Sequence, residues 1–270
     1  MEGVLTSYQG LVKHPVEIEI DGRRCPATQD EYVLEVARRN GIFIPALCAH
    51  PLLKPYGACR LCLVEIQQGQ RKRVVASCAY PVEAGQVVRT TTEQISELRR
   101  GIMELVLARC PDSPAVRALA GRLGVNASRF PPLGRAGEHC VLCGLCVRVC
   151  SELVGSSAIG FANRGRERQV DSPFSLGSAA CLGCGACAAV CPTNAISVRL
   201  GVDTLTLLPF KNTAKLDRCV RCGKPAASSP LLAFVKSRLP PALAVETLCP
   251  ECKLEQRSHA LAAVIAPRRD

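Results

Sequence analysis

The sequence predicts an α+β protein built from several small domains, and three observations support this fold class. The chain has 270 residues, which is enough for one large domain or two to four small ones. It is 48% hydrophobic but only 4% aromatic, so few large side chains are available to fill a single core. Of its 18 cysteines, 16 fall into four groups of four, which we expect to organise separate domains. We expect four segments: residues 1–92, 93–137, 138–200 and 201–270.

The sequence also indicates the cellular compartment of the protein and therefore the redox state of its cysteines. The first ten residues lack the basic and apolar regions of a secretory signal. No apolar run approaches the roughly 18 residues that a membrane helix needs. We therefore expect a cytoplasmic protein with no direct membrane insertion. In a reducing compartment, patterned cysteines are more often metal ligands or redox centres than disulfides.

Residues 1–92 show strand patterns on both sides of one short helix. Asp30 is a candidate N-cap for a helix over Glu31–Arg39, which Asn40 and Gly41 would end. The order strand, strand, helix, cysteine loop, strands is that of a β-grasp ferredoxin. We expect strands over Val16–Asp21, Arg23–Thr28, Leu61–Ile66, Val74–Cys78 and Val87–Thr90.

The first cysteine group, spaced C-x10-C-x2-C-x15-C, lies in this segment. Plant-type [2Fe–2S] ferredoxins use C-x4-C-x2-C…C, so the first gap is longer here. The longer loop resembles the large iron–sulfur subunit of respiratory NADH dehydrogenase (complex I) and the diaphorase small subunit of NAD-reducing hydrogenases. The residues that carry the resemblance are Ile44-Pro45, Gly57–Glu65 (GACRLCLVE) and Ala76–Cys78. A zinc site is disfavoured, because zinc knuckles rarely pair with a ten-residue gap. The resemblance implies a [2Fe–2S] cluster on Cys48, Cys59, Cys62 and Cys78.

Residues 93–137 predict a helical spacer. We expect a helix over Glu93–Ala108, a break at Pro111 and a second helix over Ala115–Leu123. The apolar face of the first helix would carry Ile95, Leu98, Ile102, Leu105 and Val106.

In the family that the chain resembles, this stretch holds a [4Fe–4S] cluster on one His and three Cys. Here residues 93–138 offer only Cys110 and no His, and the next His is His139. We expect this cluster to be lost, with Cys110 as a buried structural thiol, and Cys25 likewise. Electrons would then pass from the [2Fe–2S] site directly to the next clusters, or through a partner subunit.

Two runs of C-x2-C-x2-C-x3-C repeat within residues 138–200. This is the ligand run of a bacterial-type 2[4Fe–4S] ferredoxin, in which the fourth Cys of each run binds the other run's cluster. Gly144, Gly183 and Gly185 suit a backbone that bends sharply beside sulfur. Ser151 stands where Pro usually follows the first run, and two structural zinc sites are disfavoured by the spacing. Crossed ligation predicts cluster A on Cys140, Cys143, Cys146 and Cys191, and cluster B on Cys150, Cys181, Cys184 and Cys187.

The last group consists of two C-x2-C knuckles, Cys219/Cys222 and Cys249/Cys252. Each knuckle donates two thiolates, which predicts a zinc-ribbon-like module with one structural zinc. A third [4Fe–4S] cluster is the main alternative, and a mononuclear iron is less favoured. Between the knuckles, Leu231–Leu239 has the pattern of an amphipathic helix.

Function follows from what the chain carries and lacks. It has no dinucleotide fingerprint, phosphate-binding loop or nucleophile elbow, and only four His. We therefore expect a non-catalytic electron-transfer subunit with one [2Fe–2S], two [4Fe–4S] and one zinc. By resemblance, its partners in a hetero-oligomer are a flavoprotein NAD(H)-binding subunit and a catalytic hydrogenase, formate dehydrogenase or other reductase.

Two alternatives remain open. A stand-alone ferredoxin-like shuttle would need neither the β-grasp nor the C-terminal module. Nucleic-acid binding would use the formal charge of +11, but the basic residues form no tract and few aromatics are present to stack on bases. Four four-thiolate sites carry about −2 each, leaving a net charge of about +3, so we expect no nucleic-acid partner.

Overall fold

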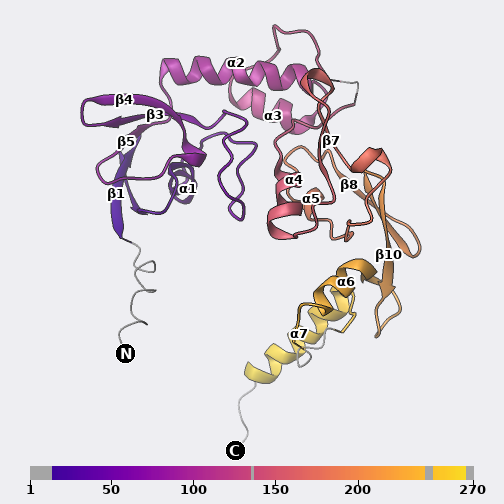
Figure 1. The fold of residues 1–270 in the computed structure, drawn as a ribbon. Helices are drawn as coiled ribbons and strands as arrows, with labels where there is room; N and C mark the ends of the chain where they lie inside the picture. Colours follow the sequence, from indigo (N-terminus) through magenta and orange to yellow (C-terminus); the bar gives the residue numbers. More distant parts are fainter. Residues whose placement is uncertain (1–13, 135–136, 241–245, 266–270) are drawn as a thin grey trace, which may run out of the picture. The chain divides into compact units, whose positions relative to one another are not determined.

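The computed structural model describes residues 14–134, 137–240 and 246–265, with side chains described as far as residue 258. Contacts divide the chain into two compact units, Met1–Leu145 and Cys146–Asp270 (Figure 1). No helix in the described part of the chain is both long enough and apolar enough to span a bilayer.

A five-stranded sheet forms the base of the first unit, in the order β2-β1-β5-β3-β4. Strand β5 runs parallel to β1 and antiparallel to β3, whereas β1–β2 and β3–β4 are antiparallel hairpins. The first hairpin turns at Asp21 and Gly22, both with positive φ, as an Asp-Gly turn requires. All five expected strands are present with small shifts at their ends. Their bounds are Pro15–Ile20 (β1), Arg23–Thr28 (β2), Leu63–Gln68 (β3), Arg71–Ala76 (β4) and Val87–Arg89 (β5).

Helix α1, Val33–Arg39, covers this sheet and begins two residues later than expected. The Glu31 carboxylate is engaged outside the helix, because it accepts a hydrogen bond from Thr28 N at 2.9 Å and pairs with Arg39. Instead, the Glu35 side chain accepts a hydrogen bond from Tyr32 N at the helix start. The expected strand end at Cys78 was also wrong, because β4 stops at Ala76 and a 3₁₀ turn, η2 (Ser77–Ala79), follows.

The spacer forms two helices, α2 (Glu93–Arg109) and α3 (Pro114–Arg122), as expected. The predicted apolar face of α2 was wrong in part: Leu98 is 40% and Leu105 48% exposed, whereas Arg99 and Met103 are buried. The physical reason is hydrogen bonding, since Arg99 turns inward to two carbonyl oxygens of the cysteine loop. A guanidinium that satisfies buried carbonyls can occupy a position that a hydrophobicity pattern gives to leucine.

The second unit contains short helices and two small sheets. Its four-stranded antiparallel sheet has the order β11-β10-β9-β8 and covers Ser197 to Ser228 without interruption, so one sheet extends across residue 200. The predicted helix at 231–239 is α6, which begins and ends earlier because Ser228 and a proline in the first turn start it. The bounds are Leu145–Arg148 (α4), Val149–Leu153 (η3), Gly160–Ala162 (β6), Gly165–Glu167 (η4), Gln169–Asp171 (β7), Pro173–Ser175 (η5), Ala186–Ala189 (α5), Ser197–Leu200 (β8), Thr204–Leu208 (β9), Asn212–Arg218 (β10), Pro225–Ser228 (β11), Ser229–Lys236 (α6) and Pro250–Ile265 (α7).

Candidate metal centres

The first cysteine group converges beside the β-grasp sheet. Cys48, Cys59 and Cys62 lie in the loop between α1 and β3, and Cys78 lies in η2 after β4. All are buried except Cys59, which is partly exposed. Backbone N–H groups already point at sulfur: Leu47 N donates to Cys59 Sγ, and Cys59 N to Cys48 Sγ, both at 3.4 Å. Such donors stabilise thiolates, the form that binds iron.

The protonation of these four sulfurs also shows that they share one site. Hydrogen bonds from the thiols of Cys59 and Cys78 lower the pKa of Cys48 to about 2. A hydrogen bond from Cys78 likewise lowers the pKa of Cys62 to about 6. The pKa of each donor, Cys59 and Cys78, is raised, because ionisation would cost it those bonds. Four thiols that exchange hydrogen bonds at one place can hold a small metal cluster.

Two polar side chains, those of Arg99 and Ser77, donate hydrogen bonds to backbone carbonyls of the cysteine loop. Arg99 on α2 donates from Nε to Leu61 O at 3.1 Å and from Nη2 to Leu63 O at 2.7 Å. The Ser77 hydroxyl donates to Cys62 O at 2.8 Å. Burial lowers the pKa of Arg99, and no salt bridge to it occurs among the described residues. Its positive charge therefore faces the carbonyls of the cysteine loop.

Cys110 lies in apolar surroundings, as expected for a structural thiol. It is 0% exposed, and burial raises its pKa to about 12. Its apolar cluster contains Met103 and Val116 from the spacer helices, together with Leu47 and Leu61, which are next to Cys48 and Cys62 in the sequence. The spacer thus packs on the cysteine loop. Cys25 is also buried, at 1% exposed, in the core of the β-grasp sheet.

The two ferredoxin-type runs repeat in backbone conformation as well as in sequence. Gly144 and Gly185 have φ of 77° and 72° just before the short helices α4 and α5. The residue before the second cysteine of each run also has positive φ: 53° at Leu142 and 64° at Gly183. The three glycines singled out from the sequence therefore occupy the predicted bends. Leu142 was missed, because nothing in a leucine signals a left-handed backbone.

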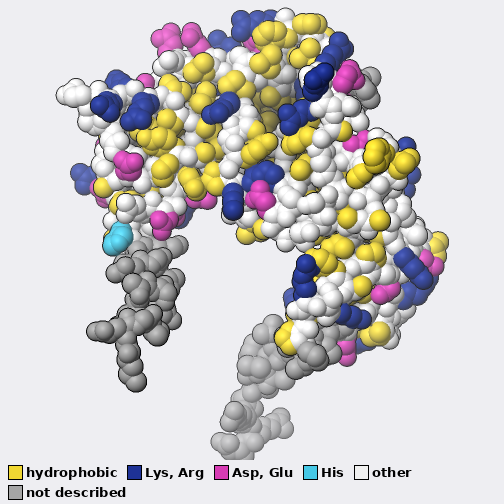
Figure 2. All heavy atoms as spheres, in the orientation of Figure 1, with side chains coloured by type: hydrophobic (Ala, Val, Ile, Leu, Met, Phe, Trp, Pro, Cys, Tyr) yellow, Lys and Arg dark blue, Asp and Glu magenta, His cyan; other side chains and the backbone are white. Residues whose placement is uncertain are grey.

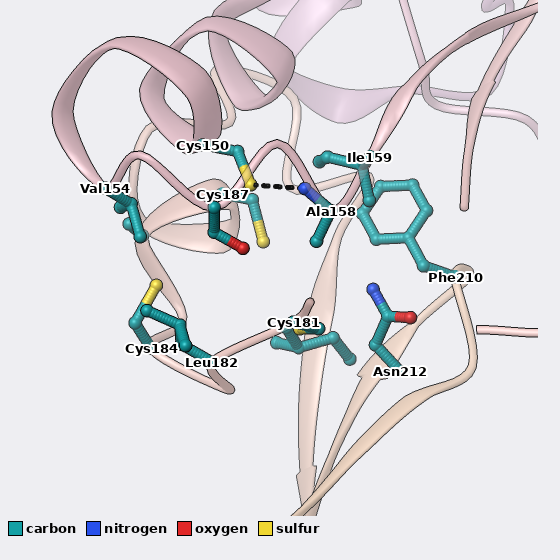
Figure 3. A pocket seen from close by; sticks show the side chains of 13 residues that line it. Cys150, Val154, Ala158, Ile159, Cys181, Leu182, Cys184, Cys187, Phe210 and Asn212 are labelled. Carbon is teal, nitrogen blue, oxygen red and sulfur yellow. Dashed lines mark hydrogen bonds between the residues drawn. The ribbon is translucent and has the colours of Figure 1, made fainter. Parts of the chain in front are cut away.

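Four cysteines drawn from both runs border one pocket in the second unit (Figure 3). They are Cys150 from η3 and Cys181, Cys184 and Cys187 from the second run, the set that crossed ligation assigns to cluster B. Cys150 Sγ accepts a hydrogen bond from Ala158 N at 3.3 Å. The chain therefore brings a cysteine of the first run to the pocket of the second.

The four cysteines that crossed ligation assigns to cluster A lie on both sides of the division in the chain. Cys140 and Cys143 precede the division at residue 145, and Cys146 and Cys191 follow it. Cys191 Sγ accepts a hydrogen bond from Ala195 N at 3.2 Å, as Cys150 does from its own downstream amide.

Three of the other residues that line the cluster B pocket lie beyond the second cysteine run, and the sequence did not point to them. Leu207, Phe210 and Asn212 come from β9, β10 and the turn between them. No motif marks them, and only the packing of the sheet against the second cysteine run could have identified them.

The last four cysteines gather most closely. The sulfur atoms of Cys219, Cys222, Cys249 and Cys252 all lie within 4.8 Å of one another. Cys222 Sγ and Cys249 Sγ are 3.6 Å apart. All are buried except Cys222. Backbone N–H groups, led by that of Cys249, lower the pKa of Cys219 to about 6, whereas burial raises the pKa of Cys252 to about 12.

Surface ion pairs connect the two knuckles. Lys224 Nζ lies 2.7 Å from Glu251 Oε2, and Arg221 Nη2 lies 3.2 Å from Glu255 Oε2. Val220 N also donates to Thr247 O at 2.9 Å. Each contact joins a residue near the first knuckle to one near the second.

Comparison with known families agrees with the three ferredoxin-type groups. The sequence model described as "2Fe-2S iron-sulfur cluster binding domain" matches residues 13–93. The model described as "4Fe-4S dicluster domain" matches residues 139–195. Neither match extends to the last four cysteines.

Relatives are similar over much of this chain. The NADPH-Fe(3+) oxidoreductase subunit alpha of Geobacter sulfurreducens is 32% identical over 222 residues, covering 73% of this chain and 24% of its own. The mitochondrial NADH-ubiquinone oxidoreductase 78 kDa subunit of Candida albicans is 30% identical over 179 residues, covering 57% and 25%. A chain in the crystal structure of H2-reduced NAD+-reducing [NiFe]-hydrogenase is 31% identical, with a TM-score of 0.51, and the match covers 58% of this chain and 74% of that one. This chain spans about a quarter of the length of the curated relatives.

The β-grasp site and the paired cysteine runs define an iron–sulfur protein of the electron-transfer class. Within that class, the chain belongs to the family of iron–sulfur subunits that includes the 78 kDa subunit of NADH-ubiquinone oxidoreductase and a subunit of NAD-reducing hydrogenase.

Proposed function

We propose that the chain is the electron-transfer subunit of a multi-subunit oxidoreductase. It would relay single electrons between a flavin- and NAD(H)-binding partner and a catalytic partner such as a hydrogenase, formate dehydrogenase or other reductase. The observation that carries the proposal is the pocket bordered by Cys150, Cys181, Cys184 and Cys187, because crossed ligation of two clusters predicts that these four cysteines meet. Patterned cysteines in this number suit a reducing cytoplasm, where they more often bind metals than form disulfides.

The ligand assignment follows the four cysteine groups. Iron–sulfur clusters supply one-electron chemistry, with potentials set by hydrogen bonds, charge and exposure. The chain's own part is to hold the thiolates and to direct N–H groups and the Arg99 charge toward them. The proposed ligands are Cys48, Cys59, Cys62 and Cys78 for [2Fe–2S]; Cys140, Cys143, Cys146 and Cys191 for cluster A; and Cys150, Cys181, Cys184 and Cys187 for cluster B.

We assign a structural zinc to Cys219, Cys222, Cys249 and Cys252. Zinc–sulfur bonds of about 2.3 Å in a tetrahedron place the sulfurs about 3.8 Å apart. Sulfur atoms within 4.8 Å of one another are near that spacing. A [4Fe–4S] cube inserts two irons and their bridging sulfides between each pair of thiolates and would hold them farther apart. The compact group therefore favours a single ion.

A direct route between the [2Fe–2S] site and the next cluster is supported inside the first unit. Helix α2 donates from Arg99 to the cysteine loop and, ten residues on, from Arg109 Nε to Cys140 O at 3.0 Å. Ten residues span about 15 Å of helix. Cys59 and Val141 pack against the same apolar cluster. The spacer thus connects both cluster loops without a cofactor of its own.

A protein partner also fits the surface better than a nucleic acid. On the face drawn in Figure 2, Lys and Arg side chains are interspersed with apolar and acidic ones and form no continuous band. Phosphate backbones are bound by clustered cations.

Purification of the native complex with metal analysis tests the proposal. We expect a flavoprotein to copurify, with about 10 iron, about 10 sulfide and one zinc per chain, from one [2Fe–2S] and two [4Fe–4S] clusters. A [2Fe–2S] EPR signal should appear on reduction. About 14 iron and no zinc would move the last site to a third cube, and a chain that purifies alone would favour a free shuttle.

A further inference from the structure

The cluster B pocket is closed on one side by residues that lie beyond the ferredoxin repeat. Leu207, Phe210 and Asn212 line it together with the four cysteines, although the dicluster match ends at residue 195 (Figure 3). Among these three, only Asn212 has a polar side chain. The Asn212 amide is therefore the polar group of these three that could interact with the cluster that the pocket is proposed to hold.

The orientation of the Asn212 amide is determined by one strong hydrogen bond. Its side chain is buried, with 3% of the residue exposed, and Oδ1 accepts a hydrogen bond from Ser178 N at 2.7 Å. Because a backbone N–H needs an acceptor, the oxygen must face Ser178. Nδ2 is then buried without a hydrogen-bond partner among the described residues. In Figure 3 this nitrogen is turned toward the space between the cysteines, and the oxygen is turned away from it.

The backbone that carries Asn212 is fixed against the second cysteine run. Gly183 packs so tightly on β10 that an added Cβ would lie 2.6 Å from Ala214 Cβ. The Ser228 hydroxyl donates to Leu182 O at 2.5 Å, and the Ser172 hydroxyl donates to Phe210 O at 3.2 Å. Contacts on both sides of the hairpin thus hold the amide in place.

A buried N–H without a partner is costly, so its persistence here calls for an acceptor. The pocket that Asn212 lines is bordered by four cysteine sulfurs, and sulfur can accept a hydrogen bond from such a donor. Cys150, which borders the same pocket, receives a hydrogen bond from the backbone N–H of Ala158.

We propose that Asn212 Nδ2 donates a hydrogen bond to a sulfur of cluster B, either a sulfide or the Cys181 thiolate, and raises its reduction potential. The inference rests on the proposed cluster ligation and deepens it. Reduction adds one negative charge to the cluster, and a donor aimed at sulfur stabilises that charge. The sheet that begins at β8 would then be part of the redox site as well as a scaffold.

The test is an EPR-monitored redox titration of the full-length chain with Asn212→Asp, which keeps the shape of the side chain but replaces the donor by a carboxylate. We expect one of the two [4Fe–4S] waves to move down while the other stays in place. The ratio of reduced to oxidised cluster B at fixed potential should fall by about tenfold, which is 59 mV for a one-electron centre. Asn212→Ala should move the same wave in the same direction by less.

The matched control is Thr213→Asp, which places a carboxylate one residue along β10 on the exposed face. It should leave both waves unchanged. An unchanged titration for Asn212→Asp, an equal shift of both waves, or an equal effect of Thr213→Asp would overturn the inference. If the native chain binds fewer than about 8 iron in [4Fe–4S] form, the proposed function itself fails instead.

A second measurement does not depend on variants. Asparagine labelled with ¹⁵N in the side-chain amide should give a nitrogen hyperfine coupling on a reduced [4Fe–4S] EPR signal of the native protein. Absence of that coupling would overturn the inference even if every Asn212 variant failed to fold.

Discussion

The β-grasp site and the last four-cysteine site each bring four cysteines together, but the proposed metal would matter to their folding to different degrees. Around the first, 16 buried residues form one core, most of them aliphatic and supplied by the sheet and α1. Around the second, the described core cluster consists of Cys219, Leu248, Cys249 and Cys252. Three of those four residues are proposed ligands. The β-grasp domain therefore has a core of its own, whereas we expect the C-terminal module to depend on the proposed metal for its core.

This difference explains how a chain with few aromatics folds at all. Aliphatic side chains and a five-stranded sheet suffice for about 80 residues in the first unit. The proposed metal would stabilise the C-terminal segment instead, as in zinc fingers, whose folding free energy is largely that of metal binding.

Removal of one cysteine from the last four-cysteine site should have the largest effect, and the effect should be confined to that region. Cys249→Ser should abolish tight zinc binding, which is worth on the order of 10 kcal/mol in small zinc modules. Amide hydrogens of α7 and of the knuckles should then exchange rapidly, while those of β1–β5 stay protected. Hydrogen exchange followed by mass spectrometry measures both regions in one sample.

Cys25→Ser is the matched control, because Cys25 is a buried cysteine that we assign to no metal. It should keep a full zinc content and a protected α7. Loss of protection throughout the β-grasp sheet in Cys249→Ser would contradict the independence of the two regions.

A cavity in the β-grasp core should have the next largest effect. Leu34, on α1, is 2% exposed, so Leu34→Ala should lower the free energy of unfolding of this domain by about 3 kcal/mol. Leu254→Ala on α7, where the side chain is 71% exposed, should change stability by less than about 0.5 kcal/mol. Equal losses in chemical denaturation of the two variants would show that the distinction between the cores is wrong.

The fold and the grouping of the cysteines were largely predictable because cysteine spacing and strand alternation are local signals. Groups of four cysteines, the Asp21-Gly22 turn and the two spacer helices all follow from patterns within a few residues. The features that were not predictable depend on long-range contacts. Arg99 reaches residues 36 to 38 positions away, and Asn212 lies in β10, beyond the cysteine runs whose pocket it lines. No local pattern contains such information.

A substitution at Arg99 should have an effect of intermediate size, because this side chain connects the spacer to the β-grasp site. Arg99→Met removes two hydrogen bonds from the carbonyls of Leu61 and Leu63, which should cost about 2 kcal/mol of stability. The potential of the [2Fe–2S] site should also fall, since a positive charge near the loop is lost. Thermal unfolding and an EPR-monitored titration measure the two effects. Arg100→Met, on the exposed face of the same helix, should alter neither.

The smallest effect we expect concerns a carboxylate that stabilises the β-grasp domain without any metal. The Glu31 carboxylate pairs with Arg39 and accepts a hydrogen bond from Thr28 N, and these contacts, with Arg39 first, lower its pKa. Glu31→Gln should cost about 0.5–1 kcal/mol at neutral pH. Because the pKa of Glu31 is lower in the folded state than the unfolded value of about 4.3, the stabilisation is complete above that value. It is lost as the pH falls through the folded pKa.

Denaturation of the wild type and Glu31→Gln should therefore differ at pH 7 and converge in strong acid. Glu17→Gln is the control, because its pairing with Arg24 at 3.7 Å is well exposed on both sides and should contribute nothing measurable at either pH. If the Glu31→Gln difference persisted unchanged below pH 3, the contribution would not come from the ionised carboxylate. The Arg39 contact would then act through packing alone. If the two stabilities do converge in acid, the ionised Glu31 carboxylate connects α1 to β2 through Arg39 and Thr28. That contact then does not depend on the cysteines of the domain.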